Sequence, residues 1–389
     1  MDDILKKLPF FVDQIQAIKE TVISNIVLVG QTPGPTFDED ARSDLFLERL
    51  AGAMVDECGK DQLKNAIGII KGTASKKHDP IFLTAHLDTP YSADDVDHNY
   101  VVRKNAITGP GILDNTVSVG ILATLPLILR HLKLTFSSDI VIAGVTQSLA
   151  RGNLRGIRHL LNTWTRPVRS GIIMEGQELG HFNYYSEGII RGEILCNIPT
   201  PGHFPAHKYK PNAILILNEV INELLCINLP QRPRCRIIIG RISGGHKHGE
   251  IAIHARLGFE IQSDSDEMVK DVYQKIEDIV EGIGHEHSVA LKMETITVQN
   301  AAALKYGHPL VKCTVAVIKS LGLKPVSESS ESELSVFLSR NIPAVAVGIT
   351  TGKNAHLANA TMRINPMFIG IAQIIGLLLA MDRGFCDEK

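Results

Sequence analysis

The sequence predicts an α/β protein with a mostly parallel sheet, flanking helices and an inserted two-layer α+β domain. Strand and helix patterns alternate over the first 186 residues, and this alternation returns after residue 298. The strands in these two parts are apolar on both faces, which is typical of a parallel sheet covered by helices. Between them, apolar and polar residues alternate along the strands, as they do in antiparallel sheets with one exposed face.

Each element of the larger domain is predicted from its own pattern of apolar residues. Residues 38–59 carry apolar side chains at a spacing near 3.6 and predict an amphipathic helix. Short apolar runs predict strands at residues 66–72, 80–88, 138–147, 169–176 and 343–349. Longer apolar runs predict buried helices at residues 114–133, 308–322 and 369–381.

The middle of the chain follows a different pattern. Residues 188–198 and 251–262 alternate like half-exposed strands, and amphipathic helices are predicted at 212–226 and 266–283. We therefore expect residues 1–186 and 298–389 to form one α/β domain. Residues 187–297 would form the inserted domain.

Composition excludes several classes of protein. A single hydrophobic core rarely exceeds roughly 250–300 residues, so a chain of 389 residues is expected to form two domains. A net charge of −2 gives no indication of binding to nucleic acid or anionic lipid. The N-terminus lacks the pattern of a secretory signal, and the longest apolar runs fall short of the roughly 20 residues that span a bilayer. Six widely spaced cysteines without a CxxC pair argue against a disulfide framework and a thiolate zinc site. We expect a cytoplasmic protein that binds neither nucleic acid nor membrane.

Five polar side chains lie at the ends of predicted strands or after glycine-rich loops. His86 and Asp88 lie two apart at the end of strand 80–88, so both point to one face of the sheet. A neutral imidazole binds zinc through one nitrogen while a carboxylate fixes the other nitrogen. Asp114 follows the loop "GPGIL", Glu175 ends a strand, and His356 follows the last strand.

Each of these residues has an ordinary structural alternative. His86 and Asp88 could be a hydrogen-bonded pair at a turn, and Asp114 could be a helix N-cap. Glu175 and His356 could be polar loop residues. Taken together at the C-terminal edge of one sheet, they predict a metal site.

The motifs in their order resemble a family of zinc-dependent exopeptidases and deacylases, which includes peptidase T, tripeptidases, aminoacylase, acetylornithine deacetylase and succinyl-diaminopimelate desuccinylase. The resemblance covers nearly the whole chain and rests on "TAHLDT", "GPGILDN", the glutamate after "SGIIM", "GH" and "PNAI", and "AHL" after "SRNIPAVAVG". It implies a zinc-exopeptidase-like fold and hydrolysis of a peptide or N-acyl amide bond. It also implies that residues 1–186 and 298–389 form a metallopeptidase-like catalytic domain, and that residues 187–297 form an inserted domain that serves as a lid or in dimerisation. The implied partner is a small peptide or an acylated amino acid.

The resemblance also implies a role for each candidate residue. His86 would ligate a first metal, with Asp88 as the partner that orients it. Asp114 would bridge two metals, with a cis peptide bond after it. Glu175 would complete the first metal's ligands, and His356 would bind the second metal.

The sequence departs from the family at its catalytic base. The family has two adjacent glutamates, a general base and a ligand of the second metal, where this chain has Gln147 and Ser148. A glutamine amide cannot accept the proton of an attacking water. The second metal would keep only Asp114 and His356, whereas the first keeps three ligands, so we expect one zinc ion per chain rather than two. Ala360 also replaces a family glutamate.

The inserted domain keeps one family feature and lacks another. His203 fits the position of a substrate-binding histidine, with His207 as its rival. Gln262 stands near the place of an arginine that binds the substrate, and glutamine cannot replace a bidentate guanidinium. Helix 212–226 could pair with its copy in a homodimer, or it could simply cover its own sheet.

Two hypotheses about function follow. The chain is a metallohydrolase with a degenerate site, in which Glu178 or Glu331 takes over the proton transfer. Alternatively, it is a non-catalytic relative that serves as a binding or scaffolding protein. Gln147, Ser148, Gln262 and Ala360 favour the second hypothesis on mechanistic grounds.

Overall fold

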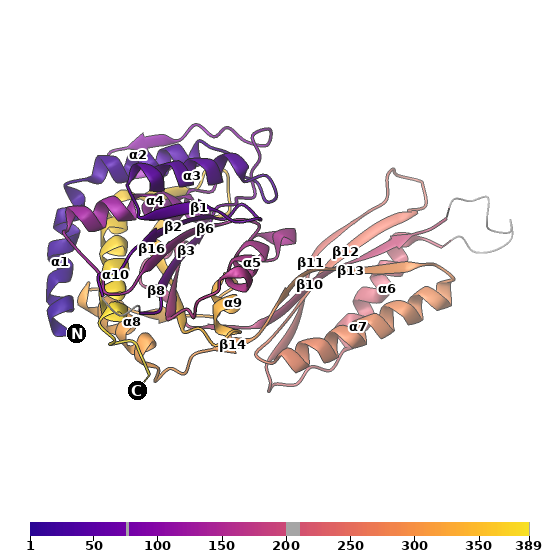
Figure 1. Ribbon diagram of the computed structural model, residues 1–389. Coiled ribbons are helices and arrows are strands. Elements are labelled where there is room, and N and C mark those ends of the chain that lie inside the picture. Colours follow the sequence, from indigo (N-terminus) through magenta and orange to yellow (C-terminus); the bar gives the residue numbers. More distant parts are fainter. Residues whose placement is uncertain (75–77, 200–210, 389) are drawn as a thin grey trace. The chain divides into compact units, whose positions relative to one another are not determined.

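The computed structural model describes residues 1–74, 78–199 and 211–388. The chain divides into two compact units, which are treated separately below (Figure 1). The larger unit comprises Met1–Ser186 and Ala303–Lys389, and the smaller unit comprises Glu187–Ala302. The chain returns to the larger unit slightly later than residue 298, because strand β13 (Leu291–Gln299) belongs wholly to the smaller sheet.

The larger unit is built on an eight-stranded sheet with the order β1-β2-β6-β3-β7-β16-β8-β15. The central pairs β6-β3, β3-β7 and β7-β16 are parallel, whereas β1-β2, β2-β6 and β16-β8 are antiparallel. The strands are β1 (Glu57–Lys60), β2 (Ala66–Ile70), β3 (Ile81–His86), β6 (Ile140–Val145), β7 (Ser170–Gln177), β8 (His181–Asn183), β15 (Val326–Ser327) and β16 (Ala344–Thr350). All residues of β3, β6 and β16 are buried, as the double-sided apolar pattern predicts.

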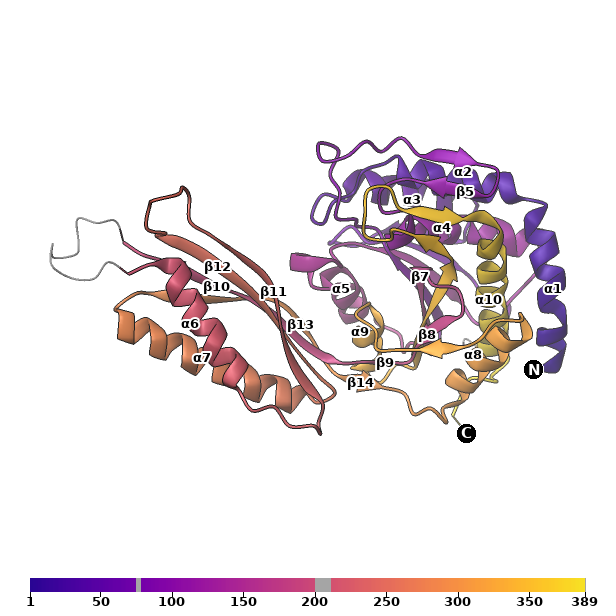
Figure 2. The same cartoon turned by 180° about the vertical axis from the view of Figure 1, so that it is seen from behind.

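Helices pack around this sheet in groups (Figures 1 and 2). Helix α10 contacts α1, α8 and β16, and helix α4 contacts α2, α3 and β3. The helices of this unit are α1 (Asp2–Gln16), α2 (Lys19–Gly30), α3 (Asp40–Gly52), α4 (Val117–His131), α5 (Arg155–Thr163), α8 (Pro309–Ser320), α9 (Leu334–Leu338) and α10 (Ile364–Asp382). Short strands β4 (Val101–Arg103), β5 (Ala106–Thr108), β17 (Gly352–Lys353) and β18 (Thr361–Arg363) form a second sheet.

Two apolar helices are longer than we expected. Ile112–His131 and Ile364–Asp382 are long and apolar enough to cross a membrane by length and composition, so the argument that these runs are too short was wrong. Of their most apolar windows, 89% and 83% are buried inside the fold. Burial on this scale identifies them as core helices of the larger unit.

The helix predicted over residues 38–59 is only partly correct. Helix α3 ends at Gly52, and Met54 adopts a left-handed conformation with φ of 53°. Residues Glu57–Lys60 then form strand β1, which pairs with β2. A glycine and a left-handed residue end the helix, although the apolar spacing continues past them.

The smaller unit is a two-layer α+β domain. Its antiparallel sheet has the order β11-β12-β10-β13, with β10 (Gly188–Asn197), β11 (Cys235–Gly244) and β12 (His254–Ser263) beside β13. Helices α6 (Ala213–Cys226) and α7 (Asp266–His287) pack on this sheet (Figure 2).

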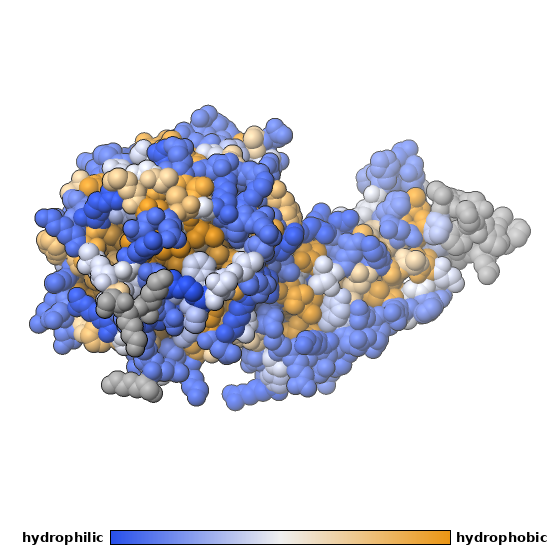
Figure 3. Space-filling model, in the orientation of Figure 1, coloured by the Kyte–Doolittle hydropathy of each residue, from blue (hydrophilic) through white to orange (hydrophobic). Residues whose placement is uncertain are grey.

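Side-chain caps start both helices of the smaller unit. Asn212 Oδ1 accepts a hydrogen bond from Ile214 N, and Ser265 Oγ accepts one from Met268 N. The outer surface of α7 is hydrophilic (Figure 3), while its Ile276 is fully buried. The smaller unit therefore has a hydrophobic core of its own.

Candidate metal centre

The ends of neighbouring strands bring the predicted residues together. His86 is the last residue of β3, and Glu175 lies on the adjacent strand β7. Asp114 lies in the turn Ile112–Thr116, which leads into α4, and His356 follows β17. His86 Nε2 lies 3.2 Å from Asp114 Oδ1, and His356 Nδ1 lies 3.8 Å from Asp114 Oδ2. The peptide bond from Asp114 to Asn115 is cis, as the resemblance implied.

His86 is buried, and carboxyl groups surround it. Its Nδ1 lies 3.0 Å from the main-chain oxygen of Asp88 and 3.4 Å from Asp88 Oδ1. Burial lowers the pKa of His86, but hydrogen bonds with Asp114 and Asp88 outweigh burial and raise the pKa well above its ordinary value. Burial conversely raises the pKa of Asp114, but the hydrogen bond with His86 and the charges of His86 and His356 lower it overall.

Asp88 holds the loop that follows β6. Its side chain is fully buried, and its Oδ2 accepts hydrogen bonds from Ser148 N at 3.0 Å and Leu149 N at 2.8 Å. Thr36 Oγ1 donates a third hydrogen bond at 2.9 Å. Asp88 thus ties the end of β3 to the segment in which the resemblance expects two glutamates.

Gln147 and Ser148 lie beside this centre. Gln147 has a left-handed φ of 53°, and its main-chain N–H donates to Glu39 Oε1 at 2.7 Å. Its side-chain oxygen is buried, and no group within the described residues donates a hydrogen bond to it. Ser148 is 7% exposed, and its hydroxyl donates to Glu333 Oε1 at 2.6 Å.

Glu333 is a site residue that the sequence reasoning missed. It immediately precedes the short helix α9, is 1% exposed and reaches the centre from a segment far along the chain. The two substitutes considered from the sequence are exposed: Glu178 pairs with His181 at 3.1 Å, and Glu331 faces solvent. The signal for Glu333 was the "SESSESE" run shortly before the last strand, but that run does not indicate which of its glutamates is buried.

Arg42 was missed as well. Its side chain is fully buried, and it donates hydrogen bonds to the main-chain oxygens of Val29, Thr32 and Leu87. Leu87 lies between His86 and Asp88. Arg42 therefore fixes the backbone that carries both of these side chains.

Among the carboxyl groups of the centre, that of Glu175 has the largest shift in pKa. Burial, opposed by the charge of His86, raises the pKa of Glu175 to about 8, and the charges of Glu333 and Asp114 act in the same direction as burial. The Ser332 hydroxyl, through a side-chain hydrogen bond, lowers it in part. Glu175 thus holds a proton at neutral pH in the absence of a cation.

The donor atoms of this centre suit a cation. Carboxyl oxygens of Asp88 and Asp114 lie 3.4 Å and 3.2 Å from the imidazole of His86, and the charges of Glu175 and Glu333 interact with that imidazole. In residues 1–74, 78–199 and 211–388, neither Glu175 Oε1 nor Glu333 Oε2 receives a hydrogen bond. Buried carboxylates are normally paired or bound to metal, so His86, Asp114 and Glu175 fit one cation by their chemistry.

These side chains are not already arranged as a coordination cluster. Among the described residues, no three His, Cys, Asp or Glu side chains form a group that could hold a metal ion. The site groups bond to one another instead, as His86 does to Asp114 and Ser148 to Glu333.

The other predicted positions fall as follows. His203 and its rival His207 lie outside the described residues. Ala360 is buried, and its main-chain oxygen accepts from Gly109 N at 3.0 Å. Gln262 is buried in β12, accepts a hydrogen bond from Arg236 Nε and lies opposite Arg236 in the β11-β12 register. Strand β11 thus carries the guanidinium of Arg236 beside Gln262, where the resemblance expects an arginine.

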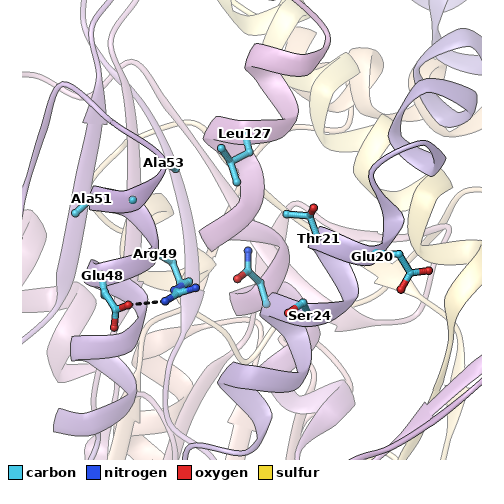
Figure 4. Close-up of a pocket in the computed structure, with 10 residues that line it drawn as sticks. Glu20, Thr21, Ser24, Glu48, Arg49, Ala51, Ala53 and Leu127 are labelled. Carbon is cyan, nitrogen blue, oxygen red and sulfur yellow. Dashed lines mark hydrogen bonds and ion pairs between the residues drawn. The ribbon is translucent and has the colours of Figure 1, made fainter.

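A separate hollow of the larger unit lies between α2, α3 and α4 (Figure 4). It has a volume of about 720 Å³, and Thr21, Ser24 and Leu127 line it together with the ion pair of Glu48 and Arg49. None of the candidate metal ligands lines this hollow.

The comparisons with known proteins identify the fold. The sequence matches no protein-family model and no curated protein sequence. Solved structures do match over nearly the whole chain. Aminopeptidase PepT from Bacillus cereus is 15% identical, with a TM-score of 0.71 over 93% of this chain and 98% of that one.

Two further structures extend the comparison. The di-peptidase Dug1p from Saccharomyces cerevisiae is 12% identical, with a TM-score of 0.77 over 97% of this chain and 99% of that one. The YXEP protein of Bacillus subtilis, a dinuclear metal-binding peptidase of the M20 family, is 14% identical, with a TM-score of 0.64 over 94% of this chain and 98% of that one. These structures belong to the kind of protein that the motif order resembles, and they confirm the predicted fold.

Proposed function

We propose that this chain is a metal-dependent hydrolase of peptide or N-acyl amide bonds, related to the zinc exopeptidases and deacylases. The observation that carries the proposal is the group of carboxyl groups near the buried His86 at the C-terminal edge of the parallel sheet, of which Asp88 and Glu333 are buried and the Asp114 side chain is 26% exposed. His86, Asp114 and Glu175 hold one zinc ion, and His356 stands on the solvent side of Asp114 with its side chain 78% exposed. The protein acts in the cytoplasm.

The residues of the chain have distinct tasks in this reaction. A zinc ion bound there supplies a Lewis acid that polarises the amide carbonyl and lowers the pKa of water. Asp88 keeps His86 in one orientation through Nδ1, which leaves Nε2 facing Asp114. Arg42 and Asp88 together hold the backbone on both sides of the site.

The substrate is a small peptide or an acylated amino acid. Dug1p is a di-peptidase and PepT an aminopeptidase, which supports a short substrate. His203 keeps its predicted role in binding substrate, and α6 remains the candidate surface for a homodimer.

One observation supports a non-catalytic alternative. Gln147 occupies the position of the family's general base, and an amide cannot take the proton of an attacking water. A protein that binds peptides without cleaving them would tolerate this replacement.

Zinc analysis combined with a hydrolysis assay tests the proposal. The full-length protein should bind about one zinc ion per chain and cleave at least one member of a panel of dipeptides, tripeptides and N-acetylated amino acids. His86→Asn should lose both the zinc and the hydrolysis, whereas the exposed Glu178→Gln should keep both. Zinc binding without any cleavage would favour the non-catalytic alternative. A wild-type protein that binds no zinc would overturn the metal site itself.

A further inference from the structure

The carboxyl group of Glu333 occupies an unusual position for a residue in a polar, serine-rich segment. Glu333 is 1% exposed, and it lies 185 residues along the chain from its hydrogen-bond partner Ser148. Its Oε1 accepts from Ser148 Oγ at 2.6 Å. Its Oε2 is buried, and nothing in the described part of the chain donates a hydrogen bond to it. Such an oxygen is costly to bury unless a further group binds it.

The partner of Glu333 is itself fixed beside the metal centre. Asp88 Oδ2 accepts from the main-chain N–H groups of Ser148 and Leu149, so the Ser148 hydroxyl has a defined position next to Asp88. This hydroxyl holds one oxygen of Glu333 and leaves the other unbonded. Ser148 therefore links the carboxyl group of Glu333 to Asp88, the partner of His86, through hydrogen bonds of 2.6 Å and 3.0 Å. The charge of Glu333 also acts on His86 and Glu175.

Ser148 is the position at which the resemblance expects a glutamate that binds metal. A serine there is too short to supply a carboxylate, but it leaves room for the carboxyl group of Glu333 and donates a hydrogen bond that orients it. On the basis of the proposed function, we infer that Glu333 Oε2 is a metal ligand and replaces, from the position before helix α9, the carboxylate that Ser148 lacks. The site thus keeps a carboxylate at this place, although the residue that supplies it comes from a different part of the chain.

Zinc affinity of the full-length protein tests this assignment without any substrate. Binding is measured by calorimetry with zinc alone, and metal content is measured after dialysis. Glu333→Gln keeps the size of the side chain and an acceptor for Ser148. It should weaken zinc binding by at least about 10-fold, because the loss of even an outer partner of a metal ligand costs about that much. Glu331→Gln, an exposed neighbour on the same segment, should bind zinc as the wild type does.

Two further variants separate ligation from a structural role. Ser148→Ala releases Glu333 without changing its charge and should weaken zinc binding less than Glu333→Gln. The exchange of Ser148→Glu with Glu333→Ser returns the carboxylate to position 148 and should recover the affinity lost in Glu333→Gln. Thermal unfolding of each metal-free variant establishes that it is folded, and the exchange variant still decides the matter if Glu333→Gln does not fold.

The outcomes distinguish this inference from the proposed function. If the wild type binds zinc and Glu333→Gln binds it equally well, Glu333 is not a ligand, while the proposed function stands. Weak binding by the exchange variant, alongside weak binding by Glu333→Gln, would show that Glu333 acts on the fold and would also overturn the inference. If the wild type binds no zinc, both the inference and the proposed metal site fail.

Discussion

Replacing Glu175 by glutamine should change how the stability of the metal-free protein depends on pH. The pKa of Glu175 is raised from 4.5 to about 8, so its proton is bound more tightly in the folded state than in the unfolded state. The stabilisation that this proton provides is complete below pH 4.5 and is lost as the pH rises to about 8. Glutamine resembles the protonated acid and cannot ionise. The stability of the Glu175→Gln variant should therefore not fall over this pH range.

The size of the effect follows from the pKa shift. Each unit of pKa corresponds to about 1.4 kcal/mol, so the wild type should lose up to about 5 kcal/mol of unfolding free energy relative to the variant. For a unit of this size, about 5 kcal/mol corresponds to a difference of roughly 10 °C in melting temperature. His86 also loses stabilisation as the pH rises through its raised pKa. Because the charge of His86 acts on Glu175, the difference between the two proteins reports the ionisation of Glu175 together with its interaction with His86.

Thermal unfolding in the presence of a chelator, from about pH 4 to pH 9, measures this difference. The melting temperatures of the wild type and of Glu175→Gln should diverge as the pH rises from about 4.5 to about 8 and stay apart above it. Glu178→Gln, whose side chain is 61% exposed, serves as the control and should follow the wild type. Parallel curves for the wild type and Glu175→Gln would refute the reasoning.

Three other perturbations have definite expected results. Arg42→Met removes the donor of three buried main-chain carbonyl groups and should lower the free energy of unfolding by about 3–5 kcal/mol in denaturant titrations. Ser148→Glu alone sets a second carboxyl group against Glu333, so it should lower the melting temperature of the metal-free protein, and added zinc should restore more of it than in the wild type. Residues Glu187–Ala302, which have their own core, should fold when expressed alone and give a cooperative melt by circular dichroism; a chain without such a melt would contradict this.

Much of the fold could be predicted because its strands and helices depend on patterns of residues that are close together in the sequence. The central strands and the helices α4 and α10 have apolar patterns that depend only on neighbouring residues. Helix α3 was predicted too long, because apolar spacing continues past Gly52 and does not reveal the left-handed Met54. His86 and Glu175 could be placed near each other from their positions at the ends of strands, since parallel strands end at one edge of a sheet.

The missed residues depend on contacts that spacing does not encode. Glu333 lies among serines and glutamates, a composition that predicts an exposed loop, yet a hydroxyl 185 residues away binds its carboxyl group. Arg42 lies on an amphipathic helix, where charged side chains usually face solvent. Instead, Arg42 is buried and donates to main-chain oxygens at the end of α2, Val29 and Thr32, and to that of Leu87. Buried charged residues are defined by partners that are distant in sequence, so they become visible only in the folded chain.

The hydrogen bonds of Asp88 bear on how this protein can evolve. The Asp88 carboxylate holds the loop after β6 by accepting hydrogen bonds from the main-chain N–H groups of Ser148 and Leu149. Every amino acid except proline provides such a group. Mutations at these two positions can therefore alter the side chains while the loop keeps its course. A lineage can lose an acidic residue there, pass through intermediates that still fold, and acquire another acidic residue elsewhere. The fold thus tolerates substitutions best at the positions whose side chains determine the chemistry of the site.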